Sequence, residues 1–168
     1  RSFWINSALA TLRELDNPNH YDREDLIKIF PKIRWYSTKL EEGLVEVSKL
    51  LFEIGVTVVY QPTIRTLALR GATFSYNSKP CIVLTNYKNF YPTLWFALIH
   101  ELYHVLFDWD DIKANRYHLT DDSITELSVR EREKEADEFS REYLFSKEKS
   151  QYIKPYLNDD AYVSKYAY

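Results

Sequence analysis

The sequence predicts one α+β domain, with helices first, about three short strands next and further helices last. Apolar residues recur at helical spacing before residue 55, and β-branched residues gather between 56 and 85. A long apolar segment and then a long charged one follow. Because runs of one element type are segregated rather than alternating, the α+β class is favoured. We expect a helical part at 1–54, a core at 55–148 and a tail at 149–168.

Three helices are expected in the N-terminal part. Residues 7–16 and 22–37 have a helical composition. In the third segment the apolar residues recur at steps of three and four: Leu40, Leu44, Val47, Leu51 and Ile54. Gly55 should end that helix, as glycine often does.

Three short strands are expected to form a small, mostly antiparallel sheet. The first, VTVVYQP at 56–62, is rich in β-branched residues and is closed by a proline. The other two, at 67–76 and 80–85, flank the turn-like Asn77-Ser78-Lys79 and therefore predict a hairpin.

Two long helices are expected after the sheet. Pro92 suits the first turn of a helix, and the apolar residues after it fall on every side as far as Phe107. This helix should therefore be central to the domain. Residues 108–123 are polar and irregular and predict a loop, whereas 123–145 are charged and strongly helical.

Composition argues against several classes of function. A net charge of −3 and a pI near 5.8 do not favour nucleic-acid binding over the chain as a whole. The one cysteine, Cys81, lies in an apolar run, which predicts a buried thiol and a reducing compartment. No apolar run approaches the ~20 residues that span a bilayer, so a cytoplasmic protein is expected. The chain begins at Arg1 and lacks methionine, which suggests a fragment of a longer protein.

An HExxH motif, formed by His100, Glu101 and His104, lies within the apolar helix. On a helix this spacing brings both imidazoles onto one face, with the glutamate beside them. Such a group can hold a tetrahedral zinc ion and place a carboxylate near the attacking water. The alternative, two core histidines satisfied by hydrogen bonds, would leave a buried carboxylate without a partner.

A catalytic zinc site needs a third protein ligand. Asp110 has the spacing of one known pattern, but Phe107 replaces the glycine of that pattern; His118 falls in the expected loop. Glu133 is favoured, because a helical projection places it on the packing face of 123–145. Asp137, one turn later, can accept the second N–H of a ligating imidazole. The same face carries Val129, Ala136, Ser140 and Leu144. Four other acids should be solvated on the opposite face: Glu131, Glu135, Glu138 and Glu142.

The paired motifs resemble the ImmA/IrrE metallopeptidases, which belong to the gluzincins. The likeness covers about residues 45–148, where HELYH is followed by EKEADEF. It implies a zincin-like fold, His100, His104 and Glu133 as zinc ligands, and Glu101 as the catalytic glutamate. The version found after a helix-turn-helix in antitoxin-like transcription regulators is the most similar. A DNA-binding part is therefore expected before residue 1, with no DNA contact elsewhere.

The resemblance implies zinc-dependent hydrolysis of a peptide bond, with a helix-turn-helix repressor as the protein substrate. Stress response, mobile elements and toxin-antitoxin regulation are the settings that it suggests. The substrate is expected to add a strand to an edge of the sheet. The donor that stabilises the oxyanion is left open between Tyr117 and His118.

Two other functions are compatible with the same residues. Tyr103 stands where the family usually has glycine, which favours a zincin-like sensor or interaction module with little or no peptidase activity. A purely structural zinc is the weaker alternative. The intact Glu101 favours the enzyme, because a structural site has no use for a general base.

Overall fold

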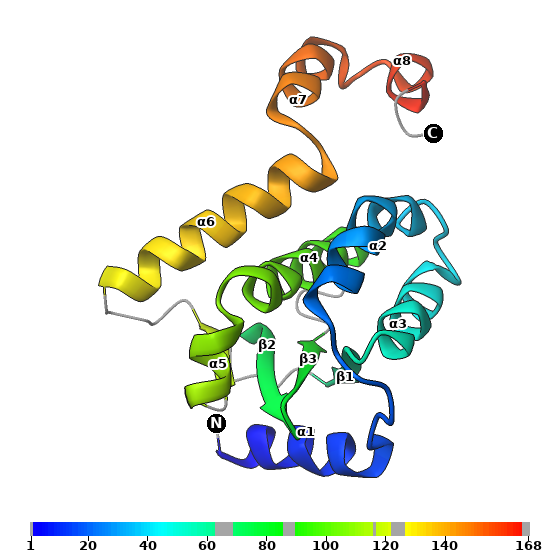
Figure 1. Cartoon of the computed structure of the whole chain (residues 1–168). Helices are drawn as coiled ribbons and strands as arrows, with labels where there is room; N and C mark the ends of the chain where they lie inside the picture. Colours follow the sequence, from blue (N-terminus) through cyan, green and yellow to red (C-terminus); the bar gives the residue numbers. More distant parts are fainter. Residues whose placement is uncertain (1, 63–68, 86–89, 116, 122–126, 166–168) are drawn as a thin grey trace.

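The computed structural model describes residues 2–62, 69–85, 90–115, 117–121 and 127–165, without the side chains of residues 2, 117–121, 127 and 128. It confirms the α+β class (Figure 1). The N-terminal helices are α1 (Ser2–Leu15), α2 (Arg23–Tyr36) and α3 (Gly43–Glu53), and the three expected strands are β1 (Thr57–Gln61), β2 (Leu69–Tyr76) and β3 (Lys79–Thr85). After them come α4 (Tyr91–Phe107), α5 (Trp109–Asn115), β4 (Tyr117–Asp121), α6 (Leu127–Leu144), α7 (Lys147–Ile153), the 3-10 turn η2 (Lys154–Tyr156) and α8 (Asp160–Ser164).

The strands form one mixed sheet in the order β1-β3-β2-β4. β2 pairs antiparallel with both β3 and β4, whereas β1 pairs parallel with β3. The predicted hairpin is present between β2 and β3. Its two-residue turn has positive φ angles at Asn77 and Ser78, the conformation that matches the twist of paired strands.

The expectation of a loop at 108–123 was wrong for most of its length. Residues 109–115 form α5, and residues 117–121 form β4 at the edge of the sheet. The polar composition of this segment did not indicate either element. α5 buries only Ile112, so its residues show little apolar pattern. β4 is defined by its antiparallel backbone pairing with β2, which composition does not record.

Alternate side chains of β3 enter two hydrophobic clusters on opposite faces of the sheet. Ile82 and Leu84 face a cluster shared with α2, α3 and α4, while Cys81 and Val83 face one shared with α1. Figure 1 shows α1 on one side of the sheet and helices α2, α3 and α4 on the opposite side. Cys81 is buried as expected, and burial raises the pKa of its thiol to about 12.

Local signals set the ends of the helices as predicted. Gly55 has φ 82° and follows α3. Its N–H donates to Phe52 and that of Val56 donates to Leu51, so the last carbonyls of α3 are satisfied. Pro92 lies in the first turn of α4. Among the helices that the structure describes, none combines the length and apolarity needed to cross a bilayer.

Helix α6 contacts the rest of the domain through both small and aromatic residues. Ala136 and Ser140 are fully buried, which allows α6 to pack closely. Near its end, the Tyr143 hydroxyl donates to the Phe30 carbonyl and accepts from the Arg34 N–H at 3.0 Å. In an uninterrupted helix the Arg34 N–H would donate to the Phe30 carbonyl. Here the Tyr143 hydroxyl bridges these two groups instead, at the turn of α2 that contains Pro31.

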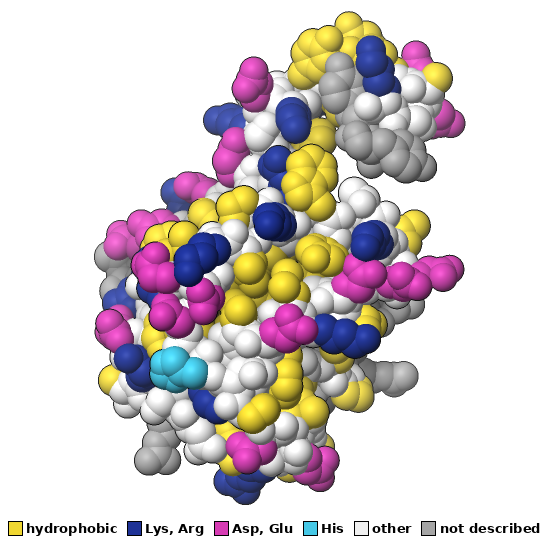
Figure 2. All heavy atoms as spheres, turned by 45° about the vertical axis from the view of Figure 1, so that its right-hand side comes forward, with side chains coloured by type: hydrophobic (Ala, Val, Ile, Leu, Met, Phe, Trp, Pro, Cys, Tyr) yellow, Lys and Arg dark blue, Asp and Glu magenta, His cyan; other side chains and the backbone are white. Residues whose placement is uncertain are grey.

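The C-terminal helices α7 and α8 extend away from the sheet in Figure 1. Figure 2 shows hydrophobic side chains gathered on this tail, and Tyr152, Tyr156 and Leu157 are among its exposed residues. Tyr156 and Tyr162 stack with ring centroids 4.2 Å apart. The tail therefore holds together partly through its own aromatic contacts.

Candidate metal centre

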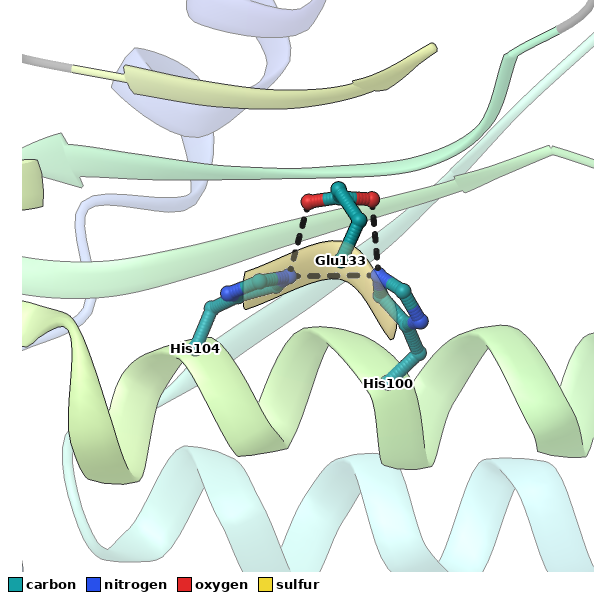
Figure 3. Close-up of side chains that lie close together, drawn as sticks. All are labelled: His100, His104 and Glu133. Carbon is teal, nitrogen blue, oxygen red and sulfur yellow. Dashed lines mark hydrogen bonds and ion pairs between the residues drawn. The ribbon is translucent and has the colours of Figure 1, made fainter. Parts of the chain in front are cut away.

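Three side chains from two helices converge on one point, as Figure 3 shows. His100 and His104 project from α4, and their Nε2 atoms lie 3.1 Å apart. Glu133 projects from α6, with Oε2 3.3 Å from Nε2 of His100 and Oε1 3.2 Å from Nε2 of His104. The structure therefore brings together the three residues that the sequence predicts as ligands.

These distances fit a single metal ion. In a tetrahedral site with metal–donor bonds of about 2.0–2.1 Å, neighbouring donor atoms lie roughly 3.3–3.4 Å apart. The Nε2–Nε2 separation of 3.1 Å falls within a few tenths of an ångström of that edge, and each Nε2 atom has a different oxygen of Glu133 at 3.2–3.3 Å. Both imidazoles are buried, whereas the Glu133 side chain is 19% exposed, so the site approaches the surface on the α6 side. The buried His100, His104 and Glu133 group can hold a metal ion.

A carboxylate fixes the ring of each histidine from behind. Nδ1 of His100 donates to Oδ1 of Asp137 at 3.0 Å, which is the contact predicted for Asp137. Nδ1 of His104 donates to Oδ2 of Asp108 at 2.7 Å. With each Nδ1 engaged in this way, both Nε2 lone pairs face the point where the ligands meet.

Sequence reasoning missed Asp108. It follows His104 by four residues, which is the spacing that brings side chains together on a helix. That signal was available, but Asp108 was assigned to the expected loop. In the structure it is the C-cap residue of α4, and its Oδ1 atom lies 3.6 Å from Nη1 of Arg132. Because Arg132 precedes Glu133 on α6, Asp108 also connects the two ligand-bearing helices.

The same carboxylates determine the protonation of the metal-free site. Burial lowers the pKa of His100, but hydrogen bonds to Asp137 and Glu133 outweigh it and raise that pKa to about 9. The pKa of His104 is also raised, because its hydrogen bonds to Asp108 and Glu133 oppose burial in the same way. Burial works to raise the pKa of Asp137, yet the contact with His100 holds it below its usual value. Protons therefore compete with a metal ion for both imidazoles, and metal binding to His100 below about pH 9 is expected to release a proton.

Glu101 lies on α4 between the two ligands and faces the sheet. Its side chain is 1% exposed, and its Oε2 atom accepts a hydrogen bond from Oγ1 of Thr73 on β2 at 2.7 Å. The costly buried carboxylate expected from the sequence thus has a hydrogen-bond donor. Its charge contributes to the raised pKa values of both His100 and His104.

Asp110, the one alternative third ligand whose side chain the structure describes, does not join this group. The Asp110 side chain is 93% exposed and pairs with Lys113 at 2.8 Å. The side chains of His118 and Tyr117 lie outside the described residues. The four acids expected to be solvated on α6 are all exposed: Glu131, Glu135, Glu138 and Glu142.

Tyr103 packs between α4 and α6. Its ring centroid lies 4.7 Å from that of Phe107 and 5.3 Å from that of Phe139. Its hydroxyl donates to Oε2 of Glu135 at 3.1 Å. Burial, together with the Glu135 carboxylate, raises the pKa of Tyr103 to about 12, so the hydroxyl remains a neutral donor at ordinary pH. Where the resembled family has glycine, this chain has a side chain that joins the two ligand-bearing helices.

Asp108→Asn is expected to weaken metal binding about tenfold, because replacing the carboxylate behind a ligating imidazole typically costs 10–100-fold in affinity. Competition between the protein and a chromophoric chelator measures the change. Asp110→Asn is the matched control, since that side chain is exposed and pairs with Lys113. Equal affinities for the Asp108→Asn variant and the parent would show that this contact does not support the site.

The chain was also compared with known proteins. It matches no family model, no curated protein and no solved structure. The resemblance to the ImmA/IrrE metallopeptidases therefore remains a prediction that depends on the HExxH and ExxxD residues.

Proposed function

We propose that this chain is a zinc-dependent metallopeptidase domain of the ImmA/IrrE type, with a zincin-like fold. One observation carries the proposal: three metal-ligating side chains converge within 3.3 Å of one another beside a buried glutamate that is not among them. A purely structural metal site needs no such carboxylate. The proposed substrate is a helix-turn-helix repressor in the cytoplasm.

Each of these residues has a part in amide hydrolysis. His100, His104 and Glu133 would hold a zinc ion, whose Lewis acidity would lower the pKa of water toward about 7 and polarise the scissile carbonyl. Glu101 accepts the proton of the attacking water at a carboxylate oxygen and passes it to the leaving amine. Asp108 and Asp137 keep both Nε2 atoms directed at the site.

A zincin-like sensor or interaction module is the second candidate. Tyr103 at the usual glycine position favours it, because the side chain adds bulk 5.6 Å from the His104 ring. The buried and hydrogen-bonded Glu101 favours the peptidase. The module needs no turnover, so cleavage separates the two candidates.

The test is incubation of the full-length protein with a helix-turn-helix regulator encoded beside it, with and without a chelator. We expect fragments of the regulator from the zinc-loaded protein, none after chelation, and their return when zinc is restored. Fragments that persist in the chelator would contradict a metal-dependent peptidase. A zinc-loaded protein that produces no fragments would favour the module.

A further inference from the structure

We propose that β2 forms a slot that fixes the carboxylate of Glu101, with Thr73 and Gly71 as positioning residues. The slot keeps Glu101 as a proton acceptor and prevents it from becoming another metal ligand. This inference rests on the proposed peptidase function for its kinetic consequence. The slot itself is a property of the folded chain and can be tested without turnover.

Thr73 forms one wall of the slot. It is fully buried on β2, and Oγ1 donates to Oε2 of Glu101 at 2.7 Å. The same hydroxyl lies 3.4 Å from the backbone carbonyl of Glu101. A hydroxyl bond to an ionised carboxylate is among the stronger protein hydrogen bonds, so it holds Oε2 against the strand.

Gly71 forms the other wall of the slot. Because glycine has no side chain, the carboxylate of Glu101 can lie against the backbone of β2 at this position. A Cβ atom at this position would lie 2.6 Å from Oε1 of Glu101, 2.9 Å from its Cγ and 3.0 Å from its Cδ. The positive φ that favours glycine is found at Gly55 but not at Gly71. Any side chain at position 71 would therefore displace the carboxylate of Glu101. The pairing of β2 with β4 shifts register between Leu69 and Ala72, and such irregularities redirect the residues of a strand.

The slot separates two glutamates that lie close to the same site. The oxygens of Glu133 face the Nε2 atoms of His100 and His104 at 3.2–3.3 Å, as metal ligands should. A second carboxylate free to rotate beside a dication would also ligate it and fill the position that water and substrate need. Because Thr73 engages Oε2 and Oε1 lies against Gly71, Glu101 stays beside that position as the base.

Thr73→Val and Thr73→Ser test the slot kinetically in the full-length protein. Valine has nearly the volume of threonine but lacks the hydroxyl, so we expect kcat to fall by roughly 10–100-fold through misplacement of the base. KM and zinc stoichiometry should be unchanged. Thr73→Ser keeps the donor and should recover most of the lost kcat. If Thr73→Val retains the parental kcat, or if serine restores nothing, the positioning role is overturned.

A double-mutant cycle with Glu101→Met tests the contact without activity. In the metal-free parent, Thr73→Val should lower the melting temperature by roughly 4–10 °C, because a buried bond to a charged group is lost. In the Glu101→Met chain, which has no carboxylate to hold, the same substitution should cause almost no fall. Equal shifts in both backgrounds would exclude the slot.

Gly71→Ala adds an independent variant, because its methyl group should displace Oε1 and lower kcat while zinc remains bound. Retention of the parental kcat by Gly71→Ala would contradict the requirement for space. The two proposals fail in different ways. A coupling between Thr73 and Glu101 in the cycle, without cleavage by the parent, would refute the peptidase and leave the slot standing.

Discussion

Glu133→Ala is expected to lower metal affinity by more than about 100-fold, which exceeds the loss typical of a carboxylate that only orients a ligand. Glu133 supplies the one anionic donor of the three, and both of its oxygens lie 3.2–3.3 Å from the histidine nitrogens. Without it, two neutral imidazoles on one helix remain. Such a pair lacks the third protein ligand that catalytic zinc sites keep.

Metal competition titrations on the parent and the variant measure this loss. Glu131→Ala is the matched control, because it removes an exposed acid from the same helix two residues earlier. The ligand assignment would be wrong if Glu133→Ala bound zinc as tightly as the parent while Asp110→Ala or His118→Ala lost it. Circular dichroism of the metal-free proteins checks that α6 remains folded in each variant.

Glu133 could be predicted from sequence because its position depends on a local periodicity. The helical projection placed it on the packing face of α6, and a residue on that face must approach whatever the helix covers. The same reasoning found Asp137, whose carboxylate contacts His100. The central helix α4 was predictable for a related reason, since its apolar residues fall on every side and require burial.

Contacts between distant segments were beyond the reach of such patterns. β4 forms by backbone pairing with β2 some 45 residues away in the chain, and its composition resembles a loop. The Tyr143 bridge to α2 joins residues separated by 109 and 113 positions. Thr73 is fully buried in β2, and no local pattern of that strand marks it as a contact of Glu101. Its hydrogen bond to Glu101 depends on how the sheet packs against α4, which a single sequence does not encode in any local pattern.

Tyr103 shows how a departure from a family pattern acquires a structural meaning. From sequence it was an obstacle beside the second histidine. In the structure its ring and hydroxyl contact Phe139 and Glu135 of α6, the helix that carries Glu133. The side chain thus contributes to the helix spacing on which the third ligand depends. Its bulk beside His104 and its contacts with α6 are two consequences of one side chain.

Glu101→Gln is expected to lower the rate of substrate cleavage by about 10²–10⁴-fold, the usual contribution of a general base, while zinc stays bound in stoichiometric amount. Glutamine has the shape of glutamate, and its carbonyl oxygen can still accept the Thr73 hydrogen bond, so the slot in β2 should remain filled. The amide nitrogen cannot take a proton from water.

Fragment formation over time and zinc content, measured on the same samples, give the two readouts. Glu138→Gln, an exposed acid on α6, controls for the loss of a charge. If Glu101→Gln cleaved as fast as the parent, the proton would have to go elsewhere, and the mechanism would fail even with every metal ligand correctly assigned.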